Sequence, residues 1–149
     1  MGFHAFQMGN NVLAYVKNGR KYGMTCAWAT MVDSNMVLML IGGQSDTGNN
    51  LEVGDVAGIS SLAKGQKDIS LALGSHHSSK DDKFATIDVS IVEDTAILIP
   101  EAKVQMVAKV VKIESSPADA NDHLIFFEVL KHAVDKEAKF LDLSEVLPE

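Results

Sequence analysis

Hydroxyl, imidazole and lysine side chains gather in the segment from Ile59 to Phe84. The segment opens with an apolar run that ends in two hydroxyls, Ser60 and Ser61. Its polar end, just before Phe84, contains Ser75, His76, His77, Ser78, Ser79, Lys80 and Lys83. In a chain of formal net charge −7, hydroxyl and ammonium donors beside an apolar run indicate a site for an anion. The same residue types are ordinary in solvated surface turns, which remain the alternative.

Competing chemistries leave no signature in the chain. A G-x-G-x-x-G motif after a strand, a G-x-x-x-x-G-K-[ST] motif and an H-E-x-x-H motif are all absent from the sequence. The run Gly58–Leu62 misses the second glycine of a nucleophile elbow. His76 and His77 could touch a metal, but adjacent loop histidines are more often solvated, so we predict no metal site. Cofactor binding is favoured over catalysis by acidic and basic side chains.

Composition bounds the class of protein. The 149 residues, 46% hydrophobic and 22% charged, suffice for one globular domain over residues 1–149. The acidic balance, with a pI near 5.1, argues against nucleic acid or an anionic membrane as partner. Cys26 is the only cysteine, so no intrachain disulfide is possible. With no visible secretory signal, and an apolar run Met36–Ile41 too short to span a bilayer, we expect a cytoplasmic protein.

Strand signals outnumber helix signals along the chain. The patterns predict strands over Tyr22–Val32, Met36–Ile41, Val56–Leu62, Thr86–Val92, Val104–Ile113, His123–Val134 and Ala138–Leu143, with the first two forming a hairpin about Asp33-Ser34-Asn35. One helix is predicted over Gln66–Leu73, with Ile69 and Leu73 on one face and Gly74 as its stop. Six or seven strands, one main helix and no βαβ rhythm predict a mainly β protein, a small antiparallel barrel.

Several motifs, in this order, resemble the flavin reductase-like family of the FMN-binding split barrel. They are GMTCAWATMV at residues 23–32, Ser45-x-Thr47, GISSLAKGQKDISLALGS at 58–75, KDDKF at 80–84, and the strand that follows Asp122-His123. The resemblance covers residues 11–134, and the shared order and spacing make it more specific than any single motif. It implies a split barrel that binds FMN or sometimes FAD.

The resemblance also implies roles for individual residues. Thr25, Cys26, Ala27 and Trp28 would line the flavin ring and ribityl chain, and Ser45, Thr47, Ser60, Lys83 and Phe84 would surround the phosphate. Ser60 stands where the family usually has Asn. For Trp28 the alternative is a plain core aromatic, and for Cys26 a small buried hydrophobe is the better interpretation.

His123 is the predicted catalytic residue. A lone histidine entering an apolar strand is usually a structural hydrogen bonder, but the Asp122-His123 pair resembles a family signature whose histidine lies near nicotinamide and flavin. Hydride transfer requires ring stacking and no strong acid or base. The resemblance therefore implies transfer of a hydride from NAD(P)H to flavin N5 and on to an acceptor.

Three functions stay open at this point. The first is an NAD(P)H-dependent flavin reductase that supplies a monooxygenase or another redox partner. The second is a flavoredoxin-like electron carrier that holds FMN tightly without independent NAD(P)H turnover, and the third is a split barrel that has lost its flavin. Family members bind flavin between two subunits, so the resemblance implies a homodimer.

Overall fold

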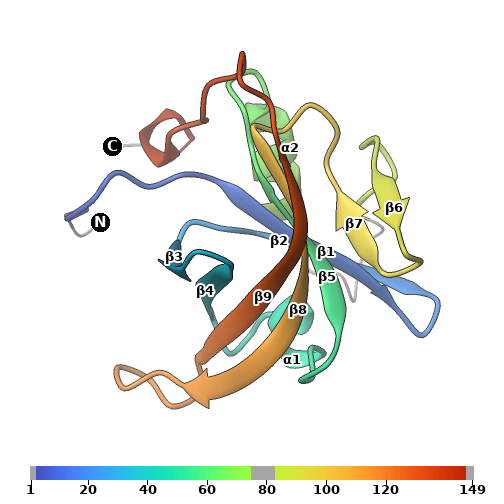
Figure 1. The fold of residues 1–149 in the computed structure, drawn as a ribbon. Helices are drawn as coiled ribbons and strands as arrows, with labels where there is room; N and C mark the ends of the chain where they lie inside the picture. Colours follow the sequence, from blue (N-terminus) through green and yellow to red (C-terminus); the bar gives the residue numbers. More distant parts are fainter. Residues whose placement is uncertain (1–2, 75–82, 147–149) are drawn as a thin grey trace.

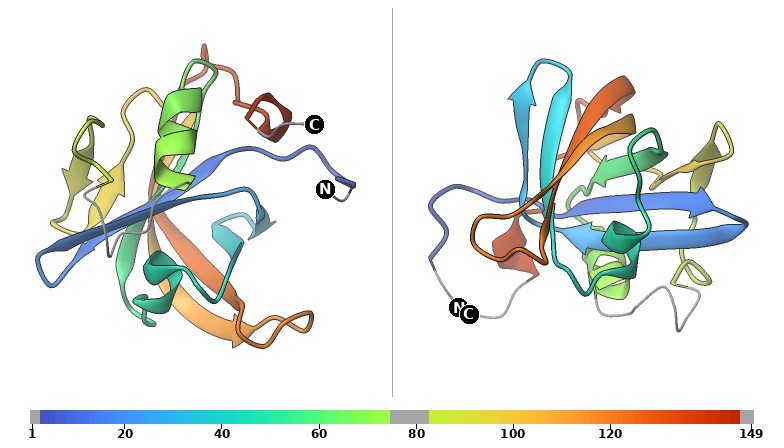
Figure 2. Two further views of the ribbon diagram at one scale, coloured as in Figure 1. Left: turned by 180° about the vertical axis from the view of Figure 1, so that it is seen from behind. Right: turned by 90° about the horizontal axis from the view of Figure 1, so that it is seen from below.

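The computed structural model describes residues 3–74 and 83–146 (Figure 1). In chain order the elements are β1 (Asn11–Lys17), β2 (Arg20–Cys26), β3 (Ala29–Asp33), β4 (Met36–Ile41), α1 (Asp46–Asn49), β5 (Val56–Ser61), α2 (Lys67–Gly74), β6 (Ser90–Val92), β7 (Ala96–Leu98), β8 (Val104–Ser115), β9 (His123–Val134) and the 3-10 turn η1 (Leu143–Glu145). The long strands curve around one another, with α2 against one end of the barrel and α1 near the other (Figures 1 and 2).

All strand pairs are antiparallel, in the order β3-β4-β9-β8-β5-β1-β7-β6, with β2 on β1. Within the described ranges no pairing joins β3 to β2 or β6, so the sheet does not close. Register shifts between Val107 and Ala108 and between Val110 and Lys112 interrupt the β8–β9 ladder, and such bulges increase local bend and twist. The predicted class, mainly β with an antiparallel split barrel and one main helix, is confirmed.

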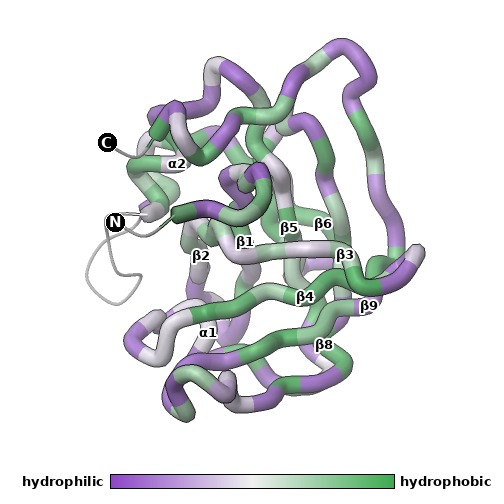
Figure 3. The backbone as a smooth tube through the Cα atoms, turned by 90° about the vertical axis from the view of Figure 1, so that its left-hand side faces the viewer, coloured by the Kyte–Doolittle hydropathy of each residue, from purple (hydrophilic) through white to green (hydrophobic). Residues whose placement is uncertain are grey.

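Strand β1 lies at the centre and separates two hydrophobic clusters. Because successive side chains of a strand point to opposite faces, Leu13 and Tyr15 enter the barrel interior, while Val12 and Ala14 pack in a second cluster that includes Leu73 of α2. The all-apolar strand β4, a hydrophobic stretch in Figure 3, has alternate residues fully buried in the interior. The barrel therefore presents a fixed frame to the segments at its ends.

Strand β1 was not among the predicted elements, and its hairpin with β2 has a clear local cause. Asn18 and Gly19 both take positive φ, 53° and 76°, as the tight turn between two right-twisted strands demands. The turn sets the register in which Tyr15 lies opposite Tyr22. Asn-Gly between two β-rich runs was the sequence signal for this hairpin.

Several predicted elements are confirmed. Met36–Ile41 and His123–Val134 are strands with the predicted bounds, the strands over 56–61 and 104–115 match to within two residues, and the helix is shifted by one residue to Lys67–Gly74. Ile69 and Leu73 pack in the same cluster, as their spacing predicted.

Three predictions were wrong in detail. The run Tyr22–Val32 is two strands, because a tight turn in which the Ala29 amide donates to the Ala27 carbonyl (3.1 Å) breaks it. The run Thr86–Val92 is a strand only over Ser90–Val92, which pairs with the unpredicted β7. The run Ala138–Leu143 forms no strand and makes only isolated bridges through Phe140 and Asp142.

None of the helices in the described part of the chain combines the length and apolar character needed to cross a bilayer.

Candidate functional site

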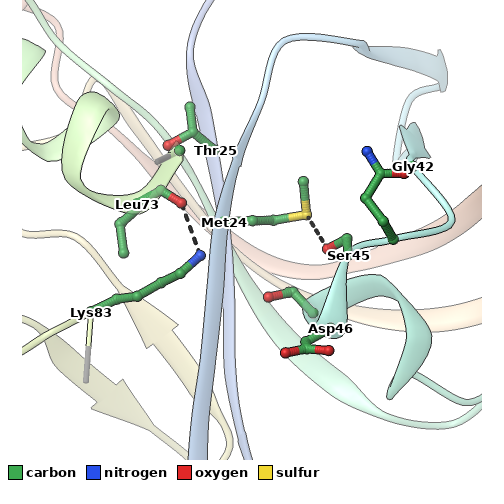
Figure 4. A pocket seen from close by; sticks show the side chains of 10 residues that line it. Met24, Thr25, Gly42, Ser45, Asp46, Leu73 and Lys83 are labelled. Carbon is green, nitrogen blue, oxygen red and sulfur yellow. Dashed lines mark hydrogen bonds between the residues drawn. The ribbon is translucent and has the colours of Figure 1, made fainter. Parts of the chain in front are cut away.

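A pocket of about 160 Å³ lies where β2, the start of α1, the end of α2 and Lys83 meet. It is lined by Met24, Thr25, Gly42, Gln44, Ser45, Asp46, Thr47, Leu73, Gly74 and Lys83. Figure 4 shows Lys83 and α2 on one side of Met24, with Ser45 and Asp46 on the other. Four of the predicted site residues therefore come together from three separate segments of the chain: Thr25, Ser45, Thr47 and Lys83.

Lys83 is the cation of the pocket. Its Nζ donates to the carbonyl oxygens of Gly23 (2.7 Å) and Leu73 (3.0 Å), so it ties β2 to the last turn of α2. Helix C-termini leave carbonyls without intrahelical partners, and a lysine satisfies them well. Burial lowers the pKa of the half-buried ammonium, and the Asp46 carboxylate opposes that shift. These two bonds use two of its three N–H donors.

The two hydroxyls of the pocket differ in how firmly they are held. Thr25 Oγ1 donates to the carbonyl of Ser70 at 2.8 Å, which fixes β2 against α2. Ser45 is the N-cap of α1: its Oγ accepts from the Gly48 amide (3.3 Å) and donates to Met24 Sδ (3.2 Å). A thioether is a weak acceptor, so the Ser45 O–H can turn to a ligand at lower cost than that of Thr25.

Thr47, Phe84 and Ser60 are buried. Thr47 lines the pocket but is only 1% exposed, and its carbonyl accepts the Tyr15 hydroxyl at 2.6 Å. Phe84 packs against Gly23, where a Cβ would lie 2.3 Å from the ring. Ser60 is fully buried in β5, and its Oγ accepts the Ile99 amide at 3.0 Å. The structure does not bring Ser60 or Phe84 to the pocket lining.

The Cys26–Trp28 segment forms the corner between β2 and β3, beside Thr25. Cys26 is buried, and its thiol lies 3.4 Å from the Trp28 carbonyl. Burial raises its pKa to about 11, as expected of the small buried residue predicted here. Trp28 is 60% exposed, so the core-aromatic alternative was wrong. Its backbone is held firmly, since its carbonyl also accepts the Leu40 amide at 2.9 Å.

His123 opens β9 and lies beside α1. Its Nε2 is 2.9 Å from Asn49 Oδ1, and the preceding residue, Asp122, accepts the Gly43 amide at 2.9 Å. Both contacts reach the loop and turn that form one wall of the pocket. The structure places His123 next to that wall without making it part of the lining.

The remaining polar residues that opened the sequence analysis, 75–80, lie outside the described residues, His76 and His77 among them. Over residues 3–74 and 83–146, no three His, Cys, Asp or Glu side chains cluster closely enough to hold a metal ion.

Six lining residues were missed by the sequence analysis: Met24, Gly42, Gln44, Asp46, Leu73 and Gly74. For one of them a signal existed, because Ser45 followed by Asp46 is a typical helix N-cap with an acidic first turn. Asp46 adds a carboxylate to the pocket that also contains the Lys83 ammonium. Met24 and Leu73 reach it only through tertiary packing, which no local pattern reveals.

Comparisons with known proteins agree on one family and one fold. A family model described as flavin reductase like domain matches residues 3–143. Among solved structures, the NADH:FAD oxidoreductase SgcE6 of Streptomyces globisporus C-1027 has TM-score 0.79 and 22% identity, covering 91% of this chain and 80% of that one. An FMN-binding protein from Thermus thermophilus has TM-score 0.80 and 16% identity, and the match covers 91% of this chain and 76% of that one. The flavoredoxin of Methanosarcina acetivorans has TM-score 0.76 and 19% identity, and the match covers 90% of this chain and 72% of that one. No curated protein matches the chain.

Proposed function

Because this chain belongs to the family of flavin reductase-like domains, we propose that it is an NAD(P)H-dependent, FMN-binding flavin reductase. The observation that supports this most directly is the pocket, which places the Lys83 ammonium and the Ser45 hydroxyl together from two separate segments of the chain. Ammonium and hydroxyl donors are the groups that a phosphate requires.

The chemistry of the lining fits one end of such a cofactor. Lys83 and Ser45 would hold the phosphate, because each has a donor that the bonds among the described residues do not fully use. Thr25, whose O–H is committed to Ser70, would position β2 rather than donate to the ligand. The Asp46 carboxylate repels an anion, so the Lys83 ammonium is needed to make the pocket accept one.

Bound flavin supplies the hydride acceptor, at its N5. In the proposal Trp28 offers an exposed aromatic face on a rigid corner next to Thr25, suited to a planar ring. We assign His123 a place beside the nicotinamide, where it would orient a ring rather than transfer a proton. Its bond to Asn49 holds its ring against α1.

The proposal includes a homodimer in the cytoplasm, with a monooxygenase or another redox protein as acceptor. Strand β3 lies at an edge of the sheet, and its Met31 and Val32 are 61% and 47% exposed. An edge strand with exposed apolar side chains favours pairing with another chain. A second copy would cover these residues together with Trp28.

Absorbance spectra and NAD(P)H assays test the proposal. We expect the purified protein to bind FMN and to oxidise NADH or NADPH when free FMN is added. Tight FMN binding without turnover would favour the flavoredoxin-like carrier instead. Absence of any flavin binding would overturn both and leave the flavin-free barrel.

A further inference from the structure

Helix α1 carries one wall of the pocket, yet it is a single turn of four residues. A helix this short has no independent stability, so its position depends on contacts from outside. One such contact comes from the barrel interior: the Tyr15 hydroxyl donates to the Thr47 carbonyl at 2.6 Å. It joins α1 directly to the central strand β1.

Tyr15 is well suited to hold another element in place. It is 1% exposed, its ring stacks on Tyr22 with centroids 5.0 Å apart and planes 15° apart, and its backbone pairs with β2 on one side and with Ala96 on the other. Burial raises the pKa of the Tyr15 hydroxyl above its usual value. The hydroxyl therefore stays protonated at neutral pH and can donate the bond. The bond therefore has a fixed origin.

Any displacement of α1 would carry the Ser45 hydroxyl with it. Ser45 caps the turn through the Gly48 amide, so its hydroxyl moves with the helix. Gly48 lies flat on β4, where a Cβ would be 2.4 Å from Ile41 Cγ2. The turn is thus held between β4 and the Tyr15 hydroxyl, and a shift of α1 would displace Ser45 from the pocket.

We infer that Tyr15 is a positioning residue for the anion end of the pocket, acting through Thr47 to keep the Ser45 hydroxyl in reach of the ligand. The inference rests on the proposed function, since it takes the ligand to be FMN. It predicts a role specific to the phosphate. A purely structural role would weaken every ligand of the barrel alike.

The test compares Tyr15→Phe with Tyr22→Phe by titration with FMN and with riboflavin, which lacks the phosphate. Tyr22 is the matched control because it is the stacked partner, 8% exposed, and its hydroxyl bonds no residue that the structure describes. We expect Tyr15→Phe to bind FMN about five- to tenfold more weakly, the effect of one lost hydrogen bond, with riboflavin affinity unchanged. Tyr22→Phe should leave both affinities as in the wild type.

Two further variants make the result decisive. Ser45→Ala should remove most of the effect of Tyr15→Phe, since the two act through one contact. Gly48→Ala, which displaces α1 from β4 and leaves Tyr15 intact, should also weaken FMN selectively and supports the inference if Tyr15→Phe does not fold. Unchanged FMN affinity in Tyr15→Phe, equal losses for both flavins, or an unselective Gly48→Ala would overturn the inference. A wild type that binds neither flavin would overturn the proposed function itself.

Discussion

Replacing Lys83 with methionine tests the anion end of the pocket most sharply. Methionine keeps most of the apolar stem and removes the ammonium. One charge-assisted hydrogen bond contributes about 1.5–3 kcal/mol, so the change should weaken FMN binding by roughly ten- to a hundredfold. Riboflavin affinity should stay unchanged, because it has no phosphate for Lys83 to bind.

The effect of Lys83→Met on stability should be small, because two contributions oppose each other. The bonds to the carbonyls of Gly23 and Leu73 are lost, but a charge that burial disfavours is removed as well. We expect the free energy of unfolding to change by no more than about 1 kcal/mol. Lys103→Met is the control: that ammonium also donates to a carbonyl, of Asp135 at 2.6 Å, outside the pocket.

The pH dependence of binding follows from the same residue. Only the protonated amine attracts phosphate, and burial places the pKa of Lys83 below the ordinary value of 10.5. The preference of the wild type for FMN over riboflavin should therefore fall as the pH rises through that lowered pKa, starting below pH 10.5. Lys83→Met should show no such fall. Fluorescence titrations with both flavins across pH measure it, and an FMN preference unaffected by Lys83→Met would refute the reasoning.

Further predictions concern the remaining groups of the site. Ser45→Ala should weaken FMN by about tenfold, whereas Thr25→Val should mainly lower the melting temperature, because its hydroxyl is committed to the protein; equal effects on FMN affinity would contradict this. His123→Ala should retain bound flavin but slow its reduction by NAD(P)H in stopped flow, and His123→Gln, which can still donate to Asn49, should be equally slow. A wild-type rate of flavin reduction in His123→Gln would show that the histidine acts only by holding Asn49. Cys26, whose pKa burial raises to about 11, should resist alkylation at pH 8 until the protein unfolds, as mass spectrometry can follow.

The fold class could be predicted from local patterns, and the errors have local explanations. Apolar runs in the sequence predicted β4 and β9 correctly, because burial of one or both faces of a strand leaves a clear hydrophobic pattern. The predicted strand Tyr22–Val32 was wrong because the turn at Ala27 contains no glycine or proline to mark it. Strand β1 was missed although Asn18-Gly19 marks its turn, and recognising that signal would have placed Tyr15 in the core.

The candidate site was only partly predictable. The cluster of hydroxyls and lysines in Ile59–Phe84 drew attention to Lys83, and the family resemblance implied a role for Ser45; both line one pocket. Ser60 has the same side-chain chemistry as Ser45, but its burial and its bond to Ile99 follow from sheet packing. Met24 and Leu73 carry no polar group that sequence reasoning could single out, and only the docking of α2 on β2 brings them to the site.

The proposed flavin reductase activity is tested most directly by the flavin spectrum of the wild-type protein titrated with FMN and then mixed anaerobically with NADH or NADPH. We predict that FMN binds with a perturbed visible absorbance band, that the nicotinamide bleaches this band, and that Lys83→Met needs a roughly ten- to hundredfold higher FMN concentration for the same binding. A wild type that leaves the FMN spectrum unchanged, or that binds FMN as well after Lys83→Met, would contradict it.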